Sequence, residues 1–351
     1  MSLSKPRHKV EPFQSVELVA GHSLLHLRAL LAQTSYALAA MLIIFGSCAA
    51  AAQGWPSRPI TMVVPFGAGG SLDIPARRLA AELSVKLGQQ IVVENRPGAN
   101  GNIGSAYVAK SSPDGYTLMF SPPGPLATNR FMYKNIPFDA DRAFAPIILL
   151  AKSPMVIAAN PKLPVSNLQD LIAYAKAHPG KLSVGTPGIG SQVHLTMELL
   201  QKISGSQVTY VPYRGAAGSS ADAIAGQIDL SLNFTPSVIG TIQDGSLRGL
   251  AVTTLQRSKQ LPDIPTVSES GFPGFEAVAS YNFVAPMGTP REIIATLNKL
   301  TNEYLDSDVG RRQLESADMQ AAGGTPEDLQ KFIAGEVAKW GPIIKAAGID
   351  M

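Results

Sequence analysis

After Pro56 the chain alternates short β-branched runs with stretches in which apolar residues recur at helical spacing. In the first unit, residues 60–66 (ITMVVPF) form such a run, a glycine-rich turn follows, and Leu72, Ala76 and Leu79 then recur every three or four residues. The short run indicates a buried strand, and the spacing that follows indicates an amphipathic helix. The alternation predicts α/β layers built on mostly parallel sheets.

Two series of these units are present, which predicts two sheets. The first series contributes three strands, and the second begins near Met155. Residues 261–276, rich in proline and glycine, are predicted to form a long irregular connection that crosses back. Beyond the run at 60–66, the predicted strands are residues 91–95, 116–121, 155–159, 182–185, 208–211, 228–233 and 249–254.

The last third of the chain has a predominantly helical pattern. Two of its helices begin with a hydroxyl residue, a proline next and a carboxylate third, at Thr289 and at Thr325, as in a capping box. Trp340 is expected to pack in this region. We predict two α/β lobes that enclose a cleft with hinge crossings, in which residues 53–153 plus 280–351 form lobe one and residues 154–279 form lobe two.

The first 52 residues have a different pattern. Four Lys and Arg residues precede a charge-free stretch that runs to Ala52 and ends in small residues. This order is typical of a signal peptide at residues 1–52, so we expect export and cleavage before Gln53. The alternatives are a retained membrane anchor and a lipid attached at Cys48. Modification of Cys48 would make the chain a lipid-anchored or ligandless regulatory module.

Composition excludes several classes of protein. Charged residues make up 16% of the chain and hydrophobic residues 45%, a balance opposite to that of disordered chains. The net charge is +3 and the basic residues are scattered, which argues against a nucleic-acid partner. Because Cys48 is the single cysteine, a disulfide framework, a zinc finger and a cysteine-ligated cluster are excluded.

Sequence signals for catalysis are poor. The chain has no G-x-S-x-G elbow and no H-E-x-x-H motif, and after cleavage of the signal peptide its histidines would be His178 and His194. Carboxylates can still act as general bases, so catalysis is disfavoured and not excluded. We expect no catalytic residue, no metal site and no cofactor, and the alternative is a secreted α/β enzyme acting on small carboxylates or esters.

Two glycine-rich turns, each between a predicted strand and a predicted helix, are the strongest candidates for binding. Residues 65–73 (PFGAGGSLD) and 185–194 (GTPGIGSQVH) place backbone N–H groups at the positive end of a helix dipole, a site for a carboxylate or phosphate. For the first turn, an equal alternative is that its glycines only permit a tight bend. Ser191 is predicted to cap the second helix, and a structural role is favoured for His194.

Two further segments add candidates. Residues 97–106 (PGANGNIGSA) form a third glycine loop, interpreted as a structural turn because its glycine spacing matches no phosphate motif. Residues 211–223 add Tyr213 as an aromatic wall and Arg214 as a cation able to bind a carboxylate through two hydrogen bonds. A solvated surface charge is the equal alternative for Arg214.

Eight segments in a fixed order give the chain a resemblance to a known family. From about Trp55 to Ile349 it resembles the extracytoplasmic solute-binding receptors of tripartite tricarboxylate transporters, the Bug receptor family. Each segment alone is weak evidence for the family, but the ordered set is highly specific for it. The segments are residues 55–77, 92–118, 133–139, 188–200, 211–230, 245–254, 261–276 and 285–294.

The resemblance implies a type II periplasmic-binding-protein fold whose two α/β lobes close around a small organic carboxylate: a dicarboxylate, tricarboxylate, aromatic acid or amino acid. It implies a periplasmic monomer that delivers this ligand to the membrane subunits of the transporter, or to a sensor ectodomain. Carried onto this sequence, the ligand-binding residues are Phe66, Ala68, Gly69, Gly70, Ser71, Asp73, Thr186, Gly188, Ile189, Gly190, Ser191, Tyr213, Arg214, Asn233 and Phe234.

Departures from the family pattern leave the specific ligand open. Gly67 stands where proline is common, Pro75 replaces an aliphatic residue, and residues 122–124 (PPG) differ from the usual Ser/Thr-rich stretch before Asn129. Asp73 would repel an anion at close range. It therefore caps the helix, orders water or accepts an ammonium group.

Overall fold

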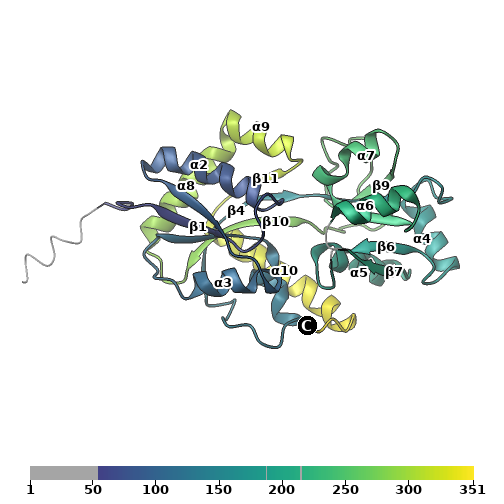
Figure 1. Ribbon diagram of the computed structural model, residues 1–351, viewed down its shortest axis with the longest axis horizontal. Helices are drawn as coiled ribbons and strands as arrows, with labels where there is room; N and C mark the ends of the chain where they lie inside the picture. Colours follow the sequence, from purple (N-terminus) through teal and green to yellow (C-terminus); the bar gives the residue numbers. More distant parts are fainter. Residues whose placement is uncertain (1–53, 187, 214–215) are drawn as a thin grey trace, which may run out of the picture. The chain divides into compact units, whose positions relative to one another are not determined.

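Two β-sheets, each covered by helices on both faces, organise residues 58–351 of the computed structural model (Figure 1). The structure describes residues 54–351 except residues 187, 214 and 215. The predicted signal peptide and Cys48 lie outside the described residues. Among the helices of the described part of the chain, none has the length and hydrophobicity that a membrane span requires.

The first sheet has six strands in the order β11-β4-β10-β3-β1-β2. Strand β1 pairs in parallel with β2 and β3, whereas β10 runs antiparallel to both β3 and β4. A strand from late in the chain is therefore inserted between two early ones. The strands are β1 (Ile60–Val64), β2 (Ile91–Asn95), β3 (Thr117–Ser121), β4 (Phe144–Ser153), β10 (Ala279–Pro286) and β11 (Gln320–Gly323).

Helices cover both faces of this first sheet, and together they form the first lobe. Helices α2 (Asp73–Leu87) and α8 (Arg291–Asp306) lie side by side on one face, followed by α9 (Asp308–Ser316). Helices α3 (Asn102–Ala109) and α10 (Pro326–Ala346) cover the other face, together with the short helical turns at residues 99–101 and 124–131. Helix α8 packs on the sheet through one face, because a buried residue recurs at about every third or fourth position.

The second sheet has the order β7-β6-β8-β5-β9, and with its helices it forms the second lobe. Strand β6 is parallel to β7 and β8, and β5 is antiparallel to β8 and β9. Every residue of β5 is buried, because helices pack on both faces of the sheet. The elements are β5 (Met155–Ala159), α4 (Leu168–Ala177), β6 (Ser183–Thr186), α5 (Gln192–Ser204), β7 (Thr209–Pro212), α6 (Ala216–Ala225), β8 (Leu230–Phe234), α7 (Ile239–Gln243) and β9 (Arg248–Val252).

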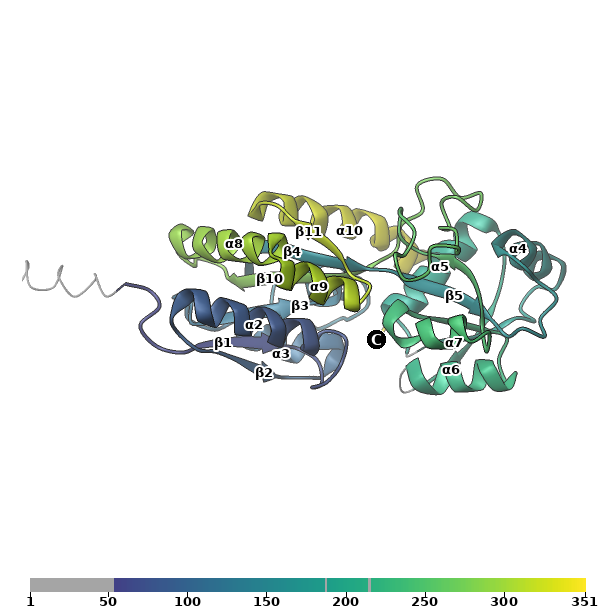
Figure 2. The ribbon, with the colours of Figure 1, turned by 90° about the horizontal axis from the view of Figure 1, so that it is seen from above.

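The chain passes between the sheets at two places and contacts both at a third. Strand β4 leads directly into β5 (Figure 2), and the irregular segment after β9 returns to β10. Helix α10 begins on the first sheet, where Leu329 is buried, but Trp340 and Ile344 near its end pack in the core of the second lobe. Residues 280–351, all expected in lobe one, thus also contribute to the second lobe's core, because the apolar face of α10 continues past its first half.

Several local expectations agree with the structure and others do not. Both sheets are mixed, not mostly parallel, because the unpredicted strands β4, β10 and β11 and the predicted strands β5 and β9 run antiparallel to their neighbours. The capping box at Thr325 forms, and residues 261–276 lack regular structure as predicted. The box at Thr289 does not form, since the Thr289 hydroxyl donates to Pro286 O and the cap position is Pro290.

Candidate ligand-binding site

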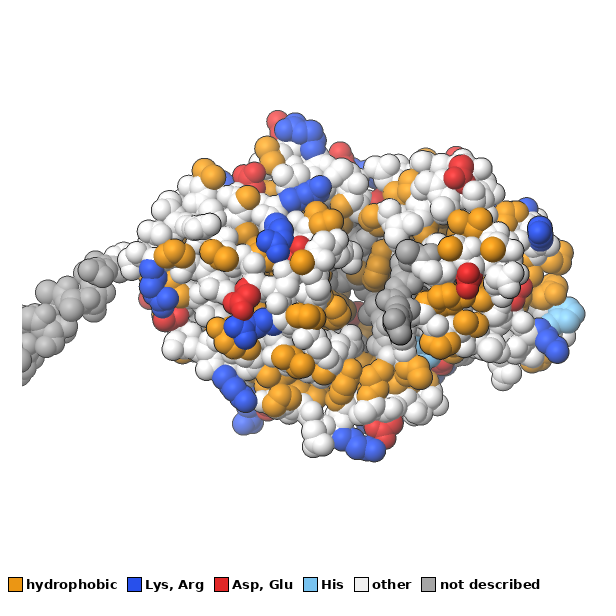
Figure 3. Space-filling model, viewed as in Figure 1, with side chains coloured by type: hydrophobic (Ala, Val, Ile, Leu, Met, Phe, Trp, Pro, Cys, Tyr) orange, Lys and Arg blue, Asp and Glu red, His pale blue; other side chains and the backbone are white. Residues whose placement is uncertain are grey.

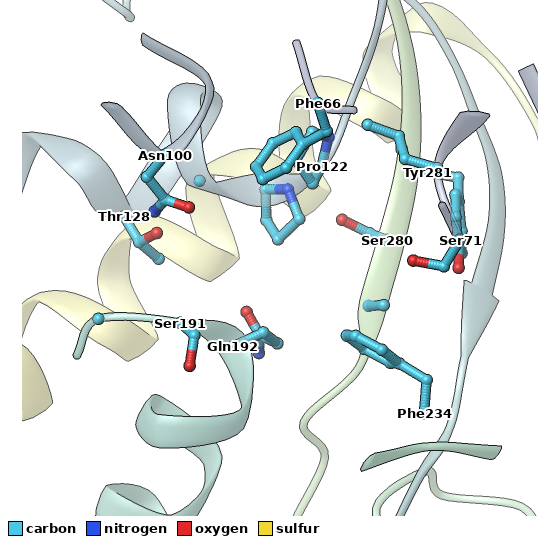
Figure 4. A pocket seen from close by; sticks show the side chains of 15 residues that line it. Phe66, Ser71, Asn100, Pro122, Thr128, Ser191, Gln192, Phe234, Ser280 and Tyr281 are labelled. Atoms are coloured by element: carbon cyan, nitrogen blue, oxygen red, sulfur yellow. The ribbon is translucent and has the colours of Figure 1, made fainter. Parts of the chain in front are cut away.

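A cavity of about 310 Å³ lies between the two lobes (Figure 4). Its volume is at the lower end of the range for small-molecule sites. Both lobes and the crossing strand β10 contribute to its wall. The described lining residues are Phe66, Ser71, Leu72, Asn100, Pro122, Pro123, Gly124 and Thr128 from the first lobe, Gly190, Ser191, Gln192 and Phe234 from the second, and Ala279, Ser280 and Tyr281 from β10.

The turn between β1 and α2 is held by the carboxylate of Asp73. One carboxylate oxygen accepts hydrogen bonds from the Gly69 N–H at 2.8 Å and from Arg77 Nε at 2.9 Å, and the other accepts from Asn95 Nδ2 at 2.8 Å. Burial alone would raise the pKa of Asp73, but the bonds from Arg77, Gly69 and Asn95 outweigh it and lower the pKa. Asp73 is therefore an ionised structural anchor of the turn and does not line the cavity.

The turn between β6 and α5 is also held by side chains of the protein. The Gly188 N–H donates to Thr186 Oγ1 at 3.3 Å, and the Gly190 N–H donates to His194 Nδ1 at 3.0 Å. Ser191 caps α5 as predicted, since its hydroxyl accepts from the His194 N–H. Gly190 has a φ of 74°, in the left-handed region, and a Cβ there would lie 2.5 Å from Met132 Sδ, so another residue would be strained at this position and would displace Met132.

His194 holds this turn in its neutral form. The residue is 6% exposed, and because Nδ1 accepts a hydrogen bond, the ring proton is on Nε2, 3.6 Å from Glu198. The ring of Tyr210 packs edge-on against it. Burial lowers the pKa of His194, with Glu198 opposing the shift. The imidazole therefore orients Gly190, which agrees with the structural role favoured from the sequence.

Replacing His194 with phenylalanine is expected to lower the free energy of unfolding by about 1–3 kcal/mol, because the buried Gly190 N–H loses its acceptor. His194→Asn is the matched control, since its amide oxygen can occupy the place of Nδ1. The wild type should also lose stability as the pH falls below 6.5, because the unfolded chain takes up the proton first.

Both effects can be measured by urea unfolding of the three proteins at about pH 7.5 and about pH 5.5. The phenylalanine variant should lose the part of the pH slope that comes from His194. Equal stability of wild type and His194→Phe at the higher pH would contradict the assignment.

These bonds change what the glycine turns can offer a ligand. The N–H groups of Gly69, Gly188 and Gly190 were expected to face an anion, but in the structure they are engaged within the protein. By contrast, Gln192 Nε2, at the first position of α5, is buried and has no hydrogen-bond partner among the described residues. Gln192 lines the cavity with its other atoms, because this nitrogen has almost no accessible surface.

The predicted site residues divide into three groups in the structure. Phe66, Ser71, Gly190, Ser191 and Phe234 line the cavity. Ala68, Gly69, Gly70, Gly188 and Ile189 belong to the same turns without lining it, while Asp73, Thr186 and Asn233 are buried structural residues. Asn233 bonds to Ser231 and Ser220, and Tyr213 donates to Asp222 at 2.6 Å, which raises the pKa of Tyr213 to about 12. Arg214 lies outside the described residues.

Several lining residues were not predicted. The glycine loop at 97–106 was interpreted as a turn only, yet Asn100 lines the cavity. A Cβ at Gly101 would lie 3.0 Å from Phe66 Cε2, so this loop also determines where the Phe66 ring sits. Residues 122–124, which depart from the family pattern, line the cavity, so this departure could have been used to predict part of its wall. Ser280 and Tyr281 gave no signal, because only the pairing of β10 with β3 and β4 brings them to the cavity.

Comparisons with known proteins agree with this architecture. The family model described as tripartite tricarboxylate transporter family receptor matches residues 75–349. The protein BugT of Bordetella pertussis is 37% identical over 301 residues, which cover 86% of this chain and 92% of BugT. A protein of Agrobacterium vitis is 36% identical over 303 residues, covering 86% of this chain and 87% of that protein.

Solved structures show the same fold. An R. palustris protein with adipate has 39% identity and a TM-score of 0.75, covering 85% of this chain and 100% of that one. The periplasmic binding protein BugD has 35% identity and a TM-score of 0.72 with the same coverage. MatC from Rhodopseudomonas palustris with bound malate has 29% identity and a TM-score of 0.71, covering 83% of this chain and 100% of MatC.

Proposed function

Because the chain belongs to the tripartite tricarboxylate transporter receptor family, a family of periplasmic solute-binding receptors, we propose that it captures a small organic carboxylate by closing its two lobes and delivers it to a tripartite tricarboxylate-type membrane transporter. The observation that carries the proposal is a single cavity lined by both glycine turns and by the crossing strand β10. The structures of relatives with adipate and with malate support a carboxylate ligand.

The proposed site uses side chains as well as backbone groups. Asn100, Thr128, Ser191 and Ser280 can each donate a hydrogen bond from the cavity wall. Hydrogen bonds to a carboxylate are about twice as strong as neutral ones, which offsets the desolvation of the anion. The predicted residues Phe66, Ser71, Gly190 and Phe234 complete this proposed site.

Closure follows from the distribution of these contacts over two lobes. A ligand held first by Phe66, Ser71 and Asn100 gains contacts with Ser191, Gln192 and Phe234 only when the second lobe approaches. The closed form is favoured by the difference in affinity between the two states. The crossings at β4–β5 and at the start of β10 are the proposed hinge. We also propose periplasmic location after removal of residues 1–52.

A thermal-shift panel tests the proposal. A ligand that binds only the folded state adds about 2.7 kcal/mol of stability at a hundred times its Kd, so at least one carboxylate should raise Tm by several degrees. The panel contains malate, adipate, citrate, aromatic monocarboxylates and amino acids, with neutral amides of the same skeletons as controls. Absence of any shift, with folding verified by circular dichroism, would overturn the binding function.

A further inference from the structure

One asparagine of the cavity wall lies in a sequence that is prone to chemical change. Asn100 is the single asparagine of the chain that is followed directly by glycine, and it lines the cavity (Figure 4). In such a pair the backbone nitrogen of the glycine can attack the side-chain carbonyl carbon of the asparagine, because the glycine has no side chain that hinders the approach.

The reaction needs only water as a co-reactant. The Gly101 nitrogen loses its proton and bonds to Asn100 Cγ, the bond from Cγ to Nδ2 breaks, and the amide leaves as ammonia with that proton. A cyclic imide remains. Water then opens the imide at one of its two carbonyls, which gives aspartate or isoaspartate at position 100.

The fold holds the reacting atoms of this pair apart. Asn100 has a φ of 50° and a ψ of 39°, a left-handed conformation that turns the backbone nitrogen of Gly101 away from the Asn100 side chain. The Gly101 N–H donates to Gly98 O at 3.0 Å, so the attacking nitrogen is also engaged. Ring closure therefore requires the turn to leave this conformation.

A buried side chain from another segment holds the asparagine itself. Asn129 has no exposed surface, and its Oδ1 accepts a hydrogen bond from Asn100 Nδ2 at 2.9 Å. Its Nδ2 donates to Asn100 O at 3.0 Å and to Asn102 Oδ1 at 2.6 Å. Ala99 and Asn100 both have a positive φ without being glycine, so this strained turn persists only while such contacts hold it.

The product of the reaction does not suit an anion-binding cavity. Asn129 Oδ1 would face a carboxylate oxygen in place of the Asn100 N–H group, so a hydrogen bond would become a contact between two acceptors. None of the described lining residues is Lys, Arg or His, so no cation among them offsets the new negative charge. An anionic ligand in the same cavity would be repelled.

We propose that the Asn100–Gly101 pair is a deamidation site that Asn129 keeps closed in the folded protein, and that reaction at this site inactivates the cavity. The first part depends only on the structure of the turn, whereas the inactivation rests on the proposed receptor function. Asn129 is a positioning residue, because it acts on the cavity through Asn100 without lining it.

Peptide mass spectrometry during incubation of the full mature chain at mildly alkaline pH measures the reaction directly. Asn100 of the folded wild type should deamidate at least about tenfold more slowly than Asn100 of the chain unfolded in guanidinium chloride, which corresponds to an opening free energy of about 1.4 kcal/mol or more. Equal rates in the two states, or no deamidation of Asn100 in the unfolded chain, would overturn the proposal without the need for any variant.

A variant tests the role of Asn129. Asn129→Ala, with folding verified by circular dichroism, should deamidate at Asn100 at least about fivefold faster than wild type, because opening of the turn no longer breaks the bonds to Asn129. A rate equal to that of wild type in the folded variant would contradict this role.

Asn100→Asp reproduces one product of the reaction and tests the inactivation. It should bind the acid that gives wild type its largest thermal shift at least about tenfold more weakly, since the new charge faces the anion. Asn135→Asp makes the same change at an exposed position outside the cavity and should leave this affinity unchanged. Equal affinity of Asn100→Asp and wild type would overturn the inactivation. Failure of wild type to bind any acid would instead overturn the proposed function and leave the deamidation result standing.

Discussion

Replacing Trp340 with alanine is expected to lower the free energy of unfolding by about 3–5 kcal/mol, because a large side chain is removed from a fully packed site. Trp340 has no exposed surface and packs with Ile343 and Ile344 in the core that includes β5 and α5 of the second lobe. Its indole N–H donates to Glu336 at 2.7 Å. The substitution therefore leaves both a cavity and a buried carboxylate with one partner fewer.

The measurement is the shift in denaturant midpoint and in Tm, followed by circular dichroism. Trp340→Phe is the control, because it retains most of the buried ring and loses the bond to Glu336, at a cost of about 1–3 kcal/mol. A loss below about 1 kcal/mol for Trp340→Ala would show that the end of α10 does not stabilise the second lobe.

Replacing Asp73 with alanine is expected to weaken ligand binding at least about tenfold and to lower the free energy of unfolding by about 2–3 kcal/mol. The carboxylate holds the Gly69 N–H, Arg77 and Asn95 together, and Phe66 and Ser71, which line the cavity, belong to the turn that these bonds hold. Loss of the anchor removes the acceptor of the Gly69 N–H and of Arg77 Nε and loosens the turn, so preorganisation of the first lobe is reduced.

The pH dependence gives an independent check on Asp73. Since its pKa is lowered in the folded protein, its stabilising effect is complete above the ordinary value of 3.8 and is lost as the pH falls below it. The difference in stability between wild type and Asp73→Ala should therefore shrink in acid. Asp308→Ala is the matched control, because the ion pair of Asp308 with Arg311 is exposed and contributes about 0–1 kcal/mol. A ligand affinity equal to that of wild type in Asp73→Ala would contradict the role of the turn.

Charged side chains of both signs are visible on one face of the molecule. On the face of the described residues shown in Figure 3, basic and acidic side chains are interspersed.

Local sequence was sufficient to predict a structural feature when that feature depends on residues close together in the chain. The β-branched run at 91–95 and the buried run at 155–159 became β2 and β5 with the predicted bounds. The caps at Ser191 and Thr325 were predictable because the hydroxyl and the amide that it binds are three residues apart. The ordered motifs were sufficient to identify the family and to predict the fold.

The three-dimensional arrangement decided which residues face the cavity. Ser280 and Tyr281 reach it because β10 pairs antiparallel with β3, where Asn282 lies opposite Ser121, 161 positions away. The glycine turns were visible in the sequence, but their N–H groups are held by Asp73 and His194, and this competition for donors depends on where those side chains pack. Periodicity and spacing report contacts within a few residues, whereas the cavity is assembled from strands, turns and a helix that only folding brings together.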